Sequence, residues 1–137
     1  MGDRAYSKRA VLVATSVLLA LSYGCLESEG EAGIRAAVNQ LSSNDYREAE
    51  KAMRTLVANG EKSIPYLRPK LHTLRKNVTM RTIHVIVQIG TPGIEALREE
   101  YRAAEEDSVR VTLGLSLAEA TADKSLLPEL SQFLTSP

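Results

Sequence analysis

Few side chains in this sequence are of types that do chemistry, and their spacing forms no familiar constellation. Two histidines, His72 and His84, stand twelve residues apart, and neither has another His or a Cys at the spacing of metal ligands. No arrangement of Ser, His and an acid stands out, and the Gly-x-Ser-x-Gly motif is missing. Glu99 and Glu100, or the acids at 105–107, could act as paired carboxylates, but such charge runs usually form solvated faces. The sequence therefore predicts no catalytic residue, no metal site and no cofactor.

The only cysteine, Cys25, closes the apolar segment near the start of the chain, so no internal disulfide is possible. The chain opens with three cations, Arg4, Lys8 and Arg9, and residues 10–22 then carry no charge. As a helix, this run would extend roughly 20 Å, which is short of the ~30 Å hydrocarbon core of a bilayer. A basic start followed by a short apolar run is typical of a secretory signal peptide.

The residues at the end of that run, Leu21-Ser22-Tyr23-Gly24-Cys25, resemble the lipobox of bacterial lipoproteins. The resemblance implies a signal peptide over 1–24, a lipid on Cys25 and a short tether over 25–30. An uncleaved signal anchor and an ordinary cleaved peptide are the alternatives. The implied location is the bacterial cell envelope, with the protein bound to the membrane through its lipid. Leu26 stands where lipoproteins retained at the inner membrane often carry Asp, which favours the outer membrane if the cell has one.

Charge is segregated along the second part of the chain. No acid occurs between Glu61 and Glu95, whereas acids are frequent from Glu95 to residue 107. The basic stretch, called here the basic strip, contains Lys62, Arg68, Lys70, Arg75, Lys76 and Arg81. It could pair with acids of the neighbouring repeat, or it could dock a charged segment of a partner protein. A phosphate or nucleic-acid site is the third alternative. The formal net charge of the whole chain is zero, so there is no bulk electrostatic case for nucleic acid.

The elements that must position these residues follow a repeat. The segment 60–67, Gly-Glu-Lys-Ser-Ile-Pro-Tyr-Leu, recurs as Gly-Thr-Pro-Gly-Ile-Glu-Ala-Leu at 90–97, and a looser copy covers 121–130 with Thr121 in place of the glycine. A period near 30 residues is typical of stacked supersecondary units. Aromatics make up only 4% of the chain, so Ala, Val, Ile and Leu must form the core, which suits packed helices.

The spacing of apolar residues predicts a leading helix over 31–41 and three helical hairpins over 45–75, 78–105 and 108–135. The predicted apolar stripe of the leading helix is Ile34, Ala37, Val38 and Leu41. That of the arm ending the first hairpin is Ile64, Leu67, Leu71 and Leu74. That of the arm ending the second is Ile94, Leu97, Tyr101 and Ala104. The last stripe is Leu126, Leu127, Leu130, Phe133 and Leu134.

Local signals place the ends and breaks of these helices. Asp45 is a good N-cap, and Glu48 completes a capping-box pair. Pro65 suits a first helical turn, whereas Pro69 predicts a bend or a late start in the same arm. Asp107 or Ser108 is expected to cap the fifth helix.

Two stretches of the pattern are less typical. Residues 78–89 are apolar on most sides, which indicates a helix buried between neighbours. Residues 109–117 alternate strictly, as a strand does, but they occupy the place of a first helix in the repeat. A lone strand would also have no partner, so we expect a helix there.

The hairpin length, the proline near the start of the second helix and the Val109-Arg110 opening resemble HEAT repeats, most closely those of phycobilin-lyase-type proteins. A TPR-like array is the second choice. The resemblance implies an all-α fold, a short right-handed α-α superhelix filling 31–137. The expected function is a non-catalytic scaffold that binds an unidentified envelope protein, without nucleic acid or metal. The alternative is a lyase-like protein that handles a small ligand or chromophore.

Overall fold

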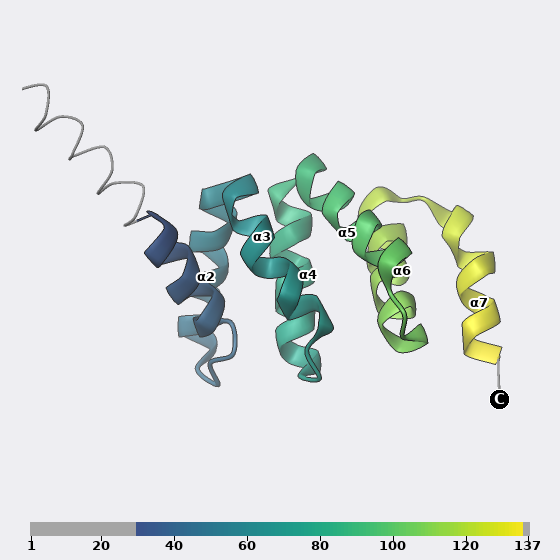
Figure 1. The fold of residues 1–137 in the computed structure, drawn as a ribbon, viewed down its shortest axis with the longest axis horizontal. Helices are drawn as coiled ribbons and strands as arrows, with labels where there is room; N and C mark the ends of the chain where they lie inside the picture. Colours follow the sequence, from purple (N-terminus) through teal and green to yellow (C-terminus); the bar gives the residue numbers. More distant parts are fainter. Residues whose placement is uncertain (1–29, 136–137) are drawn as a thin grey trace, which may run out of the picture. The chain divides into compact units, whose positions relative to one another are not determined.

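The computed structural model describes residues 30–135, and all of the secondary structure in that range is helical (Figure 1). The predicted all-α class is therefore confirmed for this part of the chain, and residues 109–117 are helical as expected. The predicted signal peptide and all of the tether before residue 30 lie outside the described residues. The described residues from Ile34 onward form one compact unit.

The helices follow one another as three hairpins after a leading helix that ends at residue 40 (Figure 1). The first hairpin consists of α2 (Tyr46–Asn59) and an interrupted arm of η1 (Gly60–Ser63), α3 (Ile64–Leu67) and η2 (Arg68–His72). The second consists of α4 (Lys76–Ile89) and α5 (Thr91–Ala103). The third consists of α6 (Asp107–Thr121), η3 (Lys124–Leu126) and α7 (Leu127–Thr135). The predicted hairpin boundaries agree with these to within a few residues.

Helix α2 begins and ends as the sequence indicated. The carboxylate of Asp45 accepts a hydrogen bond from Arg47 N at 2.8 Å, which satisfies one free amide of the first turn. The predicted capping-box pair is wrong, because the Glu48 side chain does not accept a hydrogen bond from Asp45 N. Ser43 Oγ lies between the two, since it accepts from Asp45 N and donates to Glu48 Oε2. The helix ends at Gly60, which has φ of 57°.

The arm that follows α2 is broken at its second proline. Pro65 lies in the first turn of α3, where a missing N–H costs nothing. Pro69 cannot donate to the carbonyl four residues earlier, and from Arg68 the chain continues as the 3-10 segment η2. The predicted bend at Pro69 is thus confirmed. The chain becomes extended at Thr73, and Leu74 is 100% exposed, so its assignment to the apolar stripe was wrong.

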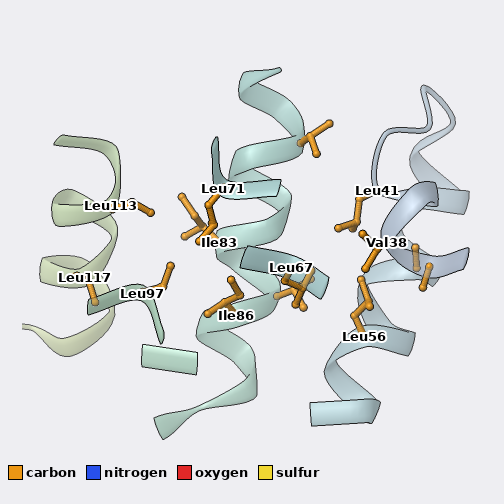
Figure 2. Close-up of a cluster of buried hydrophobic side chains, with 14 of the residues drawn as sticks. Val38, Leu41, Leu56, Leu67, Leu71, Ile83, Ile86, Leu97, Leu113 and Leu117 are labelled. Carbon is orange, nitrogen blue, oxygen red and sulfur yellow. The ribbon is translucent and has the colours of Figure 1, made fainter. Parts of the chain in front are cut away.

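Helix α4 lies at the centre of the core, where it contacts α2, η2, α5 and α6. Its buried apolar residues are Val78, Ile83, Val85 and Ile86. Met80 is 47% exposed, and His84 and Gln88, which follow at intervals of four residues, are exposed as well. The prediction of a helix apolar and buried on most sides is therefore wrong for this one face of α4. Figure 2 shows the core side chains running as one continuous cluster from Val38 and Leu41, through Leu67 and Ile86, to Leu113 and Leu117.

The three turns that join the arms of each hairpin are related. Gly60 and Gly90 both have positive φ, at 57° and 94°, which a glycine adopts without steric penalty. In the third turn Thr121 is the last residue of α6, and Ala122 takes the left-handed conformation at φ 54°. The sequence comparison had aligned Thr121 with the glycines, so that alignment was off by one residue.

The third hairpin is less buried than its stripe predicted. Leu130 is fully buried, whereas Leu127 is 41% and Leu134 is 67% exposed. Phe133 is half-buried and stacks under the guanidinium of Arg110 at 5.1 Å. The start of α6 also differs from expectation, because Glu106 is its N-cap and makes no side-chain capping bond.

Helices α4 and α5 are in close backbone contact at Gly93. A Cβ added to Gly93 would lie 1.9 Å from the carbonyl oxygen of Ile86, which is backbone and cannot rotate away. We expect Gly93→Ala to lower the free energy of unfolding by about 1–3 kcal/mol or more. Urea unfolding followed by circular dichroism measures this loss.

Gly33→Ala is the matched control, because a Cβ there meets nothing within 4 Å and the residue lies inside the leading helix. It should stabilise the protein by about 0.5–1 kcal/mol. Equal effects of the two substitutions would show that α4 and α5 are not in close contact at this point.

Candidate functional site

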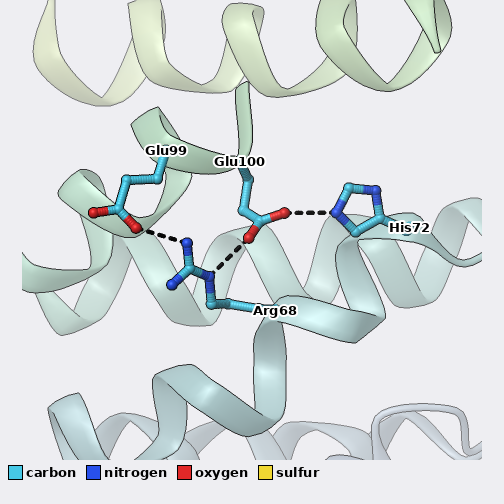
Figure 3. Close-up of polar contacts among 4 residues, drawn as sticks. All are labelled: Arg68, His72, Glu99 and Glu100. Carbon is cyan, nitrogen blue, oxygen red and sulfur yellow. Dashed lines mark hydrogen bonds and ion pairs between the residues drawn. The ribbon is translucent and has the colours of Figure 1, made fainter. Parts of the chain in front are cut away.

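An ionic cluster joins the first hairpin to the second (Figure 3). Arg68 of η2 donates through Nε to Glu100 and through Nη2 to Glu99, both on α5 and both at 2.7 Å. His72, one helical turn after Arg68, places Nε2 at 2.6 Å from the other carboxylate oxygen of Glu100. An ionised carboxylate only accepts, so the imidazole donates there. Of the three interpretations of the charge segregation, pairing between repeats is confirmed at Arg68.

Glu100 is the most enclosed member of this cluster, with 15% of its side chain exposed. Burial pushes the pKa of Glu100 upward, but hydrogen bonds from His72 and Arg68 outweigh it, and the pKa lies below its ordinary value. The pKa of Arg68 is raised, first by its hydrogen bond to Glu100 and then by that to Glu99. Both shifts indicate that the charged forms stabilise the contact between the hairpins.

The members of the basic strip are not brought together. Arg81 donates to the backbone oxygens of Leu41 and Ser43 at 2.8 and 2.9 Å, and so ties the end of the leading helix to α4. Lys62 lies at the start of the interrupted arm, whereas Arg75 and Lys76 lie just beyond its end. Among residues 30–135, the side chains of these three and of Lys70 have no ion-pair partner. Only the unpaired cations remain candidates for binding a partner.

Removing the charge of Glu100 tests the cluster through pH. Because the folded pKa is below the ordinary 4.5, the contribution of Glu100 is fully present above that pH. It is lost as pH falls through the lower folded value. Glu100→Gln should therefore lower the free energy of unfolding at neutral pH, and the difference from wild type should shrink towards about pH 3.

Unfolding titrations at the two pH values measure this. Glu95→Gln, an exposed position on the same helix, is the control and should change little at either pH. If the free energy of unfolding of Glu100→Gln is lower than that of wild type by the same amount at both pH values, Glu100 acts through packing and not through its charge.

A groove lies between the start of α4 and the start of α6, and is called here the α4–α6 groove. Its volume is about 340 Å³. Leu71 and Leu113 line it and are almost fully buried, while Leu74 and Met80 line it and are exposed. A smaller hollow of about 280 Å³ shares its residues His72, Glu106 and Val109.

Sequence reasoning missed this groove because it assigned Leu74 and Met80 to the core. The signal that could have located it is Pro69. This proline ends the regular part of the arm and so takes Leu74 off the apolar stripe.

The polar groups around the α4–α6 groove do not form a catalytic arrangement. His72 is oriented by Glu100, as a general base would be, and Ser108 lines the same groove. The hydroxyl of Ser108 donates to Glu106 at 3.5 Å, however, and makes no hydrogen bond with His72. Within the described range, no group of three His, Cys, Asp or Glu residues could hold a metal ion. The groove offers apolar and charged contacts.

The predicted lipidation site, Cys25, precedes the described residues, so its surroundings are not part of the structure. From residue 30 to residue 135, none of the helices is long and apolar enough to cross a bilayer. No known protein family, no curated protein and no solved structure matches this chain.

Proposed function

We propose that this chain is a non-catalytic, lipid-anchored binding protein of a bacterial envelope. The observation that carries the binding role is the α4–α6 groove, where the chain leaves Leu74 and Met80 exposed beside unpaired charges. Exposed apolar side chains grouped at a concave surface are characteristic of interaction sites. The hairpins would stack as a short right-handed HEAT-like superhelix, which presents broad surfaces to partners.

The membrane attachment rests on the sequence. A lipid on Cys25 would hold the domain close to the bilayer through a tether of a few residues, with the α4–α6 groove open to a neighbouring protein. The proposed partner is another protein of the envelope, and the proposal includes neither nucleic acid nor metal.

Site-directed photo-crosslinking in native membranes tests the binding role. A photoreactive amino acid at Met80 should form an adduct with a partner protein that mass spectrometry identifies. The same group at Lys51, an exposed residue of α2, is the matched control and should give no such adduct. Identical adducts from both positions, or none from Met80, would contradict a binding role for the groove.

The alternative function, handling of a small ligand or chromophore, is favoured by one observation. The groove volume of about 340 Å³ falls at the lower end of typical ligand pockets, roughly 300–1,000 Å³. Native mass spectrometry of the purified protein distinguishes the two functions. A bound small molecule of defined mass would favour the alternative, and an unliganded protein would favour the binding module.

A further inference from the structure

We infer that the α4–α6 groove binds a protein segment in which an apolar side chain is flanked by an acid on one side and a base on the other. This inference rests on the proposed binding function and specifies the chemistry of its partner.

The apolar part of the groove is preformed. Leu71 and Leu113 supply a floor that packing already fixes, because both are also members of the core cluster. Leu74 and Met80 stand at the rim, and the described chain leaves them largely uncovered. An apolar side chain seated between them would remove the exposed surface of both residues from water, which favours binding.

The two rims of the groove carry opposite charge. Lys76, the first residue of α4, lines the groove, and Arg75 is the N-cap just before it. Neither side chain has an ion-pair partner among residues 30–135. Glu105 and Glu106 precede α6 on the other side, and Glu106 lines the groove. The carboxylate of Glu106 accepts a hydrogen bond from Ser108 Oγ at 3.5 Å, and its backbone oxygen accepts from Arg110 N. Within the part of the chain that the structure describes, no ion pair joins the start of α4 to the start of α6. A bound segment can therefore pair with both rims at once, which fixes its direction.

This distribution of charge favours a protein segment over an anionic surface. A phosphate-rich partner would be attracted by Arg75 and Lys76 but repelled by Glu105 and Glu106 across the same groove. A segment with one charge of each sign meets no like charge on either rim.

Three fluorescent peptides of equal length test this on the full chain in neutral detergent micelles. Each has a central leucine, flanked by acid and base, by acids only, or by bases only. Fluorescence anisotropy should show the mixed peptide binding about 2–5-fold more tightly than either of the others, as expected for one exposed ion pair gained.

Charge reversal of the rims makes the assignment specific. Lys76→Glu should weaken binding of the mixed peptide about 2–5-fold and shift the preference to the basic peptide. Glu106→Lys should shift the preference to the acidic peptide. The double variant should recover tight binding of the mixed peptide, because the rims are exchanged and the peptide can turn round. Lys51→Glu, on α2, is the control and should change nothing.

The apolar anchor is tested separately. Met80→Ser should weaken the binding of all three peptides about tenfold, because the groove loses an apolar contact. Leu127→Ser is the control and should leave the affinity for all three peptides unchanged. It alters an exposed leucine of α7 that does not line the groove.

Equal affinities for the three peptides would overturn the inference, as would a preference for acids alone that disappears in salt. If photo-crosslinking from Met80 succeeds and the peptides show no preference, the proposed function stands and the segment chemistry is wrong. If the peptides behave as expected and no partner is crosslinked, the groove assignment stands and the envelope partner is wrong.

Discussion

Truncation of Ile86 to alanine is expected to lower the free energy of unfolding by about 2–5 kcal/mol. Ile86 is fully buried on α4, the helix that contacts α2, η2, α5 and α6. The substitution removes apolar contacts and leaves a cavity that the surrounding helices can fill only in part. Since small domains are stable by about 5–15 kcal/mol, the loss is a large fraction of the total.

Urea unfolding of Ile86→Ala and Ile86→Val measures the effect even if the alanine variant does not fold. The valine variant should lose about 0.5–1.5 kcal/mol. Met80→Ala, on the exposed side of the same helix, is the control and should change stability by no more than about 0.5 kcal/mol. A loss under about 1 kcal/mol for Ile86→Ala would place this residue outside the centre of the core.

Replacement of Cys25 by serine is expected to abolish the attachment of lipid chains to the protein. Each acyl CH₂ buried in a bilayer contributes about 0.8 kcal/mol, so several chains hold a protein far more firmly than one. The serine variant lacks the sulfur that would carry them. It should remain as a precursor that is uncleaved or cleaved elsewhere.

Intact-mass analysis of detergent-extracted protein decides this, with wild type and Cys25→Ser compared. The wild type should have lost residues 1–24 and gained the mass of the lipid. The helical domain should unfold at the same urea concentration in both, because the buried residues of the described range, 30–135, begin at Ile34. A wild-type mass equal to that of the unmodified full chain would contradict lipidation and leave an uncleaved anchor.

The repeat made most of the fold predictable from the sequence. The spacing of Ile34, Ala37, Val38 and Leu41 marked the buried side of the leading helix, and all four are buried. The repeat also decided the structure of residues 109–117, whose alternation alone favours a strand. The alternation alone could not predict the helix, because α6 has apolar residues on several sides. Its position between α5 and α7 determines which of these residues become buried.

The candidate site was less predictable, because it depends on contacts between distant residues. The sequence showed that Arg68 and Arg81 are basic, but not that one pairs with Glu99 and Glu100 and the other with backbone oxygens near residue 41. These partners lie 31 to 40 residues away along the chain. Composition cannot distinguish a cation that joins two hairpins from one that is free to bind a partner.

The left-handed backbone of Ala122 places strain in the turn of the third hairpin that the turns of the first two hairpins do not have. Glycine enters this region of backbone space freely, whereas an L-residue there costs roughly 1–2 kcal/mol. Gly60 and Gly90 also have positive φ, with ψ of −133° and −146°, and as glycines they avoid such a cost in the first two turns, whereas the third turn incurs it. In an array whose units are stabilised by their immediate neighbours, the strained unit at one end is the first to detach. We therefore expect local opening to begin at the carboxyl-terminal hairpin and to be rarest around α4.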